Sequence, residues 1–94
     1  MPRQKVVQFT ASVANNGTVN IQPGSGATWL VFSIECGGTF ELRRVSGSNT
    51  ITLGRVLGKV DFAVPIVVNP SAYLRLTNVS GATQHVAVTY FVDN

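Results

Sequence analysis

The sequence predicts an all-β domain, an antiparallel β-sandwich or jelly roll of about eight short strands. Helix periodicity is absent, because no window places apolar residues at i, i+3, i+4 and i+7. Alternation of apolar and polar residues recurs about every ten residues, and clusters of Gly, Asn, Pro and Ser separate the alternating segments. With 94 residues the chain has the size of one domain, so residues 1–94 are expected to form a single β-sandwich domain.

The first half of the chain predicts four strands. They cover residues 7–13, 18–22, 28–36 and 39–45. Turn-forming residues separate the first three, at Asn15–Gly17 and at residues 23–26. Gly37-Gly38 predicts a two-residue hairpin turn, since a pair of glycines permits positive φ.

The predicted strand 28–36 is apolar on both faces. Leu30, Phe32, Ile34 and Cys36 share one face, and Trp29 and Val31 lie on the other. A strand with one wet face would alternate more strictly with polar residues. Both faces of this strand are therefore expected to be covered, one of them by a subunit contact.

The second half predicts four more strands. They cover residues 50–57, 60–68, 72–78 and 84–92, with turns at 46–49, Gly58-Lys59, 69–71 and 79–82. Pro65 lacks an N–H, so the strand 60–68 is expected to be either an edge strand or two short strands divided by a bend.

Composition indicates a surface that is partly covered. Charged residues make up 12% of the chain, against about 25% in an average soluble domain. We expect a homo-oligomer, with a trimer favoured, whose contacts cover part of this surface. The net charge is +3, and the longest cationic run is Arg43-Arg44, which does not predict specific nucleic-acid binding.

Cys36 is the only cysteine, which excludes an intrachain disulfide. The N-terminus has no apolar stretch typical of a signal peptide, and no run of about eighteen apolar residues predicts a membrane span. The sequence therefore predicts a soluble protein that is made in a cytoplasm and does not bind a membrane.

Residues for catalysis are few, and we expect no enzyme activity, no metal and no cofactor. His85 is the only histidine, and no motif such as G-x-S-x-G supplies it with a nucleophile. Glu35 and Glu41 are expected to lie on adjacent strands of the Gly37-Gly38 hairpin, near enough to be cross-strand neighbours. Paired carboxylates can hydrolyse glycosides, but ion pairing of Glu41 with Arg43 is the simpler interpretation.

A sugar-binding face is an alternative function. Its residues would be Trp29, Arg43, Arg55, Tyr73 and Arg75, because aromatic rings stack on sugars and arginines donate to hydroxyl groups. In the other interpretation, Tyr73 and Arg75 form the outer face of an ordinary strand, and Trp29 fills the core or a subunit contact.

The N-terminal residues 1–8 predict an arm that contacts a neighbouring subunit or a particle surface. Pro2 disfavours regular structure at the start, whereas the strand pattern already begins at Val6. Arg3 and Lys5 could pair with an acidic surface, although strand addition should contribute more than such exposed pairs.

Two segments, SGSNTITLGRV and AYLRLTNVSGATQHVAVTY, resemble small β-sandwich accessory proteins of tailed-bacteriophage virions. The resemblance implies a non-enzymatic capsid decoration, or cement, protein that is made in the host cytoplasm and binds the major capsid protein on the virion surface. A tail or fibre attachment module has the same features. The residues expected at the subunit or capsid interface are Arg3, Lys5, Val7, Trp29, Val31, Arg43, Arg55, Tyr73, Arg75, His85 and Phe91.

Overall fold

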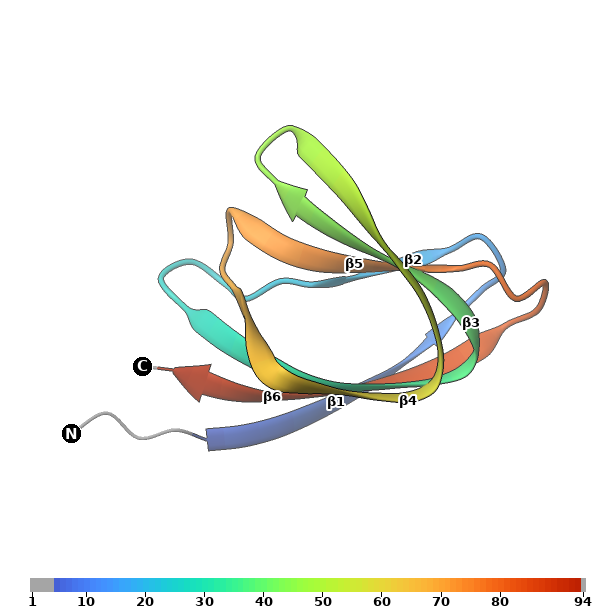
Figure 1. The fold of residues 1–94 in the computed structure, drawn as a ribbon, viewed down its shortest axis with the longest axis horizontal. Helices are drawn as coiled ribbons and strands as arrows, with labels where there is room; N and C mark the ends of the chain where they lie inside the picture. The colour runs from blue at the N-terminus through green and yellow to red at the C-terminus, as the bar shows by residue number, and fades with distance from the viewer. Residues whose placement is uncertain (1–4, 94) are drawn as a thin grey trace.

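The computed structural model describes residues 5–93, apart from the side chain of Asp93, and these residues form one curled antiparallel sheet (Figure 1). Its six strands are β1 (Lys5–Val13), β2 (Thr18–Ile21), β3 (Thr28–Ser46), β4 (Asn49–Val68), β5 (Ala72–Asn78) and β6 (Gln84–Asp93). The all-β prediction is confirmed. The predicted number of eight short strands is too high, because β3 and β4 each join two of them.

The sheet forms two layers because the long hairpin of β3 and β4 belongs to both. In the first layer, β6 lies between β1 and residues 28–36 of β3. In the second layer, β5 lies between β2 and residues 40–46 of β3. β4 follows the other side of β3 through both layers. Figure 1 shows the two layers facing each other.

The predicted hairpin at Gly37-Gly38 is wrong, and these glycines form the corner at which β3 passes from one layer to the other. Neither has the positive φ that a tight two-residue turn requires. The register runs from Cys36 opposite Gly58 to Phe40 opposite Val56, so β3 carries extra residues at this corner. A Cβ on Gly38 would lie 2.8 Å from the side chain of Gln84, so a larger residue at this corner would require Gln84 to move.

The predicted turn at Gly58-Lys59 is also part of a continuous strand. Gly58 has φ +72° and lies opposite Cys36, so β4 bends at the same corner as β3. The true hairpin turn between the two strands lies at 46–49, where Ser46 pairs with Asn49 and Gly47 has φ +59°. The other predicted turns are confirmed.

A β-bulge corrects the predicted faces of residues 28–36. The register with both β4 and β6 shifts between Val31 and Ser33. The shift turns Trp29 and Val31 toward the side of the sheet that carries Ile34, and it leaves Leu30 and Phe32 on the other side. Val31 is fully buried in the core, so it is not available for the predicted subunit contact.

The core lies between the layers and is closed at one end by a buried amide. Its largest fully buried side chains come from both layers and include Phe40, Ile21, Ile34, Leu74 and Leu76. Asn78 is also fully buried, and its Nδ2 donates to the carbonyls of Val13 and Ala82. Its Oδ1 accepts from the backbone N–H and the hydroxyl of Ser80, so the whole amide is satisfied.

The predicted N-terminal arm falls partly outside the described residues, which begin at Lys5. Lys5–Gln8 form the start of β1 and pair with β6 of the same chain, from Lys5 opposite Val92 to Gln8 opposite Thr89. The strand that the sequence indicated from Val6 therefore finds its partner in β6 of the same chain, without a neighbouring subunit. β1 has no second strand partner within residues 5–93 and lies at an edge of the sheet.

Candidate functional site

The outer edge of β4 has no strand partner within residues 5–93. Within residues 5–93, β3 is the one strand that pairs with β4, although β4 is 20 residues long. The backbone groups of β4 that point away from β3 are therefore open to strand addition. We call this unpaired side of the strand the β4 edge. Of the two predictions for the strand with Pro65, the edge strand is confirmed, and the pairing of β4 with β3 is also interrupted between Asp61 and Ile66.

Exposed aliphatic side chains concentrate on the same strand. Among the described residues, five of the six exposed large hydrophobic side chains belong to β4; they are Ile51 (60% exposed), Leu53 (50%), Leu57 (67%), Val64 (80%) and Val67 (47%), and they are called the β4 apolar set below. These side chains contribute little to the core of their own chain. A long edge strand with this composition is a site of aggregation unless another surface covers it.

A second apolar feature crosses the outer face of the first layer and ends on β4. Val6 lies opposite Phe91, Phe91 opposite Leu30, and Leu30 opposite Val67. Phe32 packs beside Phe91 with ring centroids 4.7 Å apart. The predicted interface residue Phe91 thus lies in the middle of an apolar row that leads from the β1 edge to the β4 edge.

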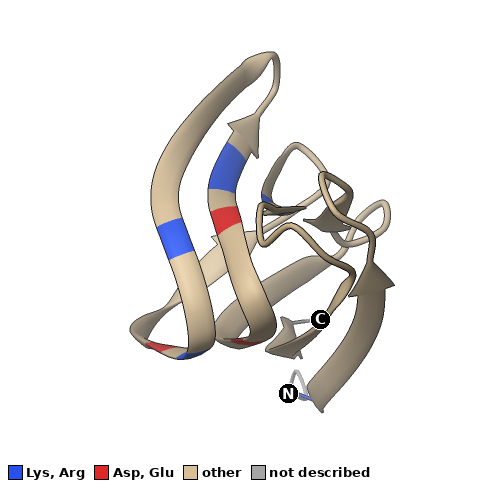
Figure 2. Ribbon diagram, turned by 90° about the vertical axis from the view of Figure 1, so that its right-hand side faces the viewer, with Lys and Arg blue, Asp and Glu red and all other residues tan. Residues whose placement is uncertain are grey.

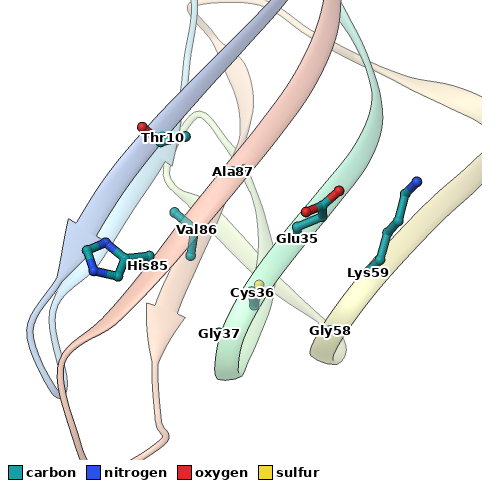
Figure 3. A pocket seen from close by; sticks show the side chains of 9 residues that line it. All are labelled: Thr10, Glu35, Cys36, Gly37, Gly58, Lys59, His85, Val86 and Ala87. Carbon is teal, nitrogen blue, oxygen red and sulfur yellow. The ribbon is translucent and has the colours of Figure 1, made fainter.

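A shallow hollow of about 590 Å³ lies farther along the same face (Figure 3). The hollow exists because three of its lining residues, Ala87, Gly37 and Gly58, have small side chains or none. Its polar lining residues are Thr10, Glu35, Lys59 and His85. Glu35 lies directly opposite Lys59 on one side and Ala87 on the other. The hollow therefore combines four polar side chains from four neighbouring strands.

The polar groups of the hollow do not converge on one point. Figure 3 shows the imidazole of His85 turned away from the carboxylate of Glu35, and the ammonium of Lys59 stands apart on β4. Burial raises the pKa of Cys36 from 9.0 to about 11, so its thiol is a poor nucleophile at neutral pH. No cluster of three metal-ligating side chains occurs among residues 5–93. The absence of enzyme activity stays a prediction.

The two glutamates occupy different layers, so the predicted cross-strand pair of Glu35 and Glu41 is wrong. Both belong to β3, on either side of the corner at Gly37-Gly38. Glu41 forms an ion pair with Arg43 two residues along, as the sequence indicated, and it lies opposite Arg55 of β4.

The outer face of the second layer brings three of the predicted arginines together. Arg43 lies directly opposite Arg75 of β5, and Arg55 lies one row away on β4. Tyr73 joins them, because its hydroxyl accepts a hydrogen bond of 3.4 Å from Arg75. Figure 2 shows cationic segments in blue around one acidic segment in red on the arms of the β3–β4 hairpin.

Trp29 does not join this group. Its indole stacks on the ring of Tyr90, with centroids 4.1 Å apart and an angle of 23° between the planes, and it packs against the core. Val7 is also half-buried against the core, whereas Lys5 and His85 are exposed. Arg3 lies outside the described residues. The predicted set of five sugar-binding residues is therefore divided between two parts of the molecule.

Known proteins give no further guidance. No protein-family model matches the chain, and a search of curated proteins finds no similar sequence. Among the described residues, no helix is long and apolar enough to span a membrane.

The β4 apolar set is the surface feature that the sequence analysis missed. The alternation of residues 50–57 and 60–68 predicts strands, but it does not say which side chains are exposed. Their exposure depends on where β4 lies in the sheet. The density of aliphatic residues around Pro65, a proline typical of edge strands, is a signal that could have found Val64 and Val67.

Proposed function

We propose that this protein is a non-enzymatic structural component of a virion, a capsid decoration protein that associates with copies of itself and binds the shell. The β4 edge with its apolar set is the observation that carries the proposal. A monomer would expose both to water, whereas an assembly protein uses such surfaces for contacts.

The proposed oligomer is a ring of three copies. β4 offers an open edge, and β1 and β2 each have a single strand partner within residues 5–93. Addition of β4 to an edge strand of the next copy is a head-to-tail contact, and a head-to-tail contact closes into a ring when its rotation is 120°. In such a ring each copy covers one β4 edge and leaves another face for the shell.

The apolar row of the first layer is the proposed contact with the major capsid protein. It combines Phe91 and Phe32 with aliphatic neighbours on a sheet face, and aromatic residues are enriched at the centres of protein interfaces. A tail or fibre attachment module would use the same features, and the location on the particle separates the two functions.

The test is to purify virus particles from a host that carries the gene and to label them with an antibody against this chain. Labelling over the whole head surface is expected, together with reduced resistance to heat in particles that lack the gene. Labelling of the tail would show that the protein is a tail or fibre attachment module and not a capsid decoration protein. Absence of the protein from purified particles would overturn the proposal.

A further inference from the structure

We infer that the outer face of the second layer is a binding site for an acidic saccharide, with a carboxylate held between Arg43 and Arg75. The site is formed by two rows of side chains that cross four strands. One row runs Asn20, Arg75, Arg43 and Thr52, and the next runs Thr18, Thr77, Glu41 and Arg55. This inference does not depend on the proposed role in a virion.

The pairing of Arg43 with Arg75 is unfavourable by itself. Residues directly opposite in antiparallel strands have Cβ atoms about 5 Å apart, and like charges at such positions destabilise a sheet. The ion pair with Glu41 compensates Arg43 alone. An anion between the two guanidinium groups would convert the repulsion into two attractive contacts.

Arg75 is held in place by neutral groups. Its Nε donates to Oδ1 of Asn20 at 3.0 Å, and one terminal nitrogen donates to the hydroxyl of Tyr73 at 3.4 Å. No ion pair among residues 5–93 involves Arg75. Its charge is therefore positioned without being neutralised, as in an anion site that is organised before its ligand arrives.

The surroundings favour a saccharide over other polyanions. The two rows contain amide, hydroxyl, carboxylate and guanidinium groups and no aliphatic side chain, whereas the centre of a protein interface is usually apolar. These groups can bond to sugar hydroxyls, and the hydroxyl of Tyr73, whose side chain also packs against the core, lies within hydrogen-bond distance of Arg75. Three arginines on one face are few for a nucleic-acid site.

The binding test uses three carboxylate-bearing saccharides, namely oligogalacturonate, hyaluronan oligosaccharide and sialyllactose, at near-physiological salt. Poly-L-glutamate and duplex DNA of matched charge are the polyanion comparisons. At least one saccharide is expected to bind at least about tenfold more tightly than either comparison, because its hydroxyls add hydrogen bonds to the charge contact. Binding to none of the saccharides, or equal binding to all polyanions, would overturn the inference.

Variants locate the site. Arg43→Gln and Arg75→Gln are each expected to weaken binding about tenfold, and Arg75→Lys less, since it keeps the charge and loses the planar fork. Arg44→Gln is the matched control, because it removes the same charge from the other side of β3, where Arg44 donates to the carbonyl of Val67. It should change the dissociation constant less than about twofold. An equal loss in Arg44→Gln would show a nonspecific charge effect and contradict the assignment.

Discussion

β3 and β4 are neighbouring strands of nearly equal length, 19 and 20 residues, yet they differ in how many of their side chains are buried. β3 has strand partners on both sides, and buried side chains occur throughout it from Val31 to Val45. β4 pairs on one side alone within residues 5–93, and Val56 and Val68 are its buried side chains. A similar content of apolar residues builds the core in one strand and leaves an uncovered surface in the other.

The comparison shows that the apolar residues of β4 exceed what this fold needs. Sheet edges in monomers are usually short, charged or bulged, which prevents association. β4 has Pro65, a few charges and an irregular stretch between Asp61 and Ile66, but it keeps its exposed aliphatic side chains. Substitutions in the two strands should therefore differ strongly in their effect on folding, and in the opposite order on association.

The largest loss of stability is expected for Phe40→Ala in β3. Phe40 is fully buried at the corner between the layers, and its truncation leaves a cavity that the sheet cannot close. The free energy of unfolding should fall by about 3 to 5 kcal/mol. Denaturant unfolding followed by circular dichroism measures the loss, and a change below about 1 kcal/mol would show that β3 is not the central strand of the core.

Asn78→Ala should have the next largest effect. It removes the amide that donates to the carbonyls of Val13 and Ala82 at the closed end of the core, so the carbonyl of Val13 loses this donor and the carbonyl of Ala82 keeps only the hydroxyl of Ser80. A loss of about 3 kcal/mol is expected from the same unfolding measurement. Asn15→Ala removes one exposed hydrogen bond to the N–H of Gly81 and serves as the control, with an expected loss of about 1 kcal/mol or less.

Much of this architecture could be predicted from the sequence, and the failures have a common cause. The strand pattern and most turns follow from local alternation and turn residues, and Pro65 correctly indicated an edge. Gly37-Gly38 was misassigned because a bent strand and a hairpin turn both require small residues, and the choice depends on partners distant in sequence. The cationic face was partly predicted, since Arg43, Tyr73 and Arg75 meet there. Trp29 lies in the other layer, because β3 bends at Gly37-Gly38 between them, and local alternation cannot reveal that corner.

The thiol of Cys36 tests the enclosure of β3 in a different way. Its pKa of about 11 in the folded chain lies above the ordinary 9.0, so the folded state keeps a proton that the unfolded state releases between these values. Stability should therefore decrease as the pH rises from 9 to 11. At pH 8, iodoacetamide should modify the folded chain at least about tenfold more slowly than the chain in urea. Equal rates would mean that this part of β3 is open to solvent.

The smallest effect on folding is expected on β4. Val64→Thr keeps the shape of a side chain that is 80% exposed. The free energy of unfolding of the dissociated chain should change by no more than about 0.5 kcal/mol. Denaturation at several protein concentrations separates this value from any loss of association. A loss of more than about 2 kcal/mol would place Val64 in the core and remove the contrast between the strands.

Sedimentation velocity tests the proposed assembly through β4 most directly. The protein is expected to sediment as a trimer at micromolar concentration, and the double variant Leu57→Lys, Val64→Lys as a folded monomer, because charged side chains on an edge strand oppose pairing. Ser25→Lys, Thr83→Lys adds the same charge at exposed loop positions and should remain trimeric. A wild-type protein that is monomeric at this concentration, or a β4 variant that still forms the trimer, would contradict the conclusion that copies of this chain cover the β4 edge.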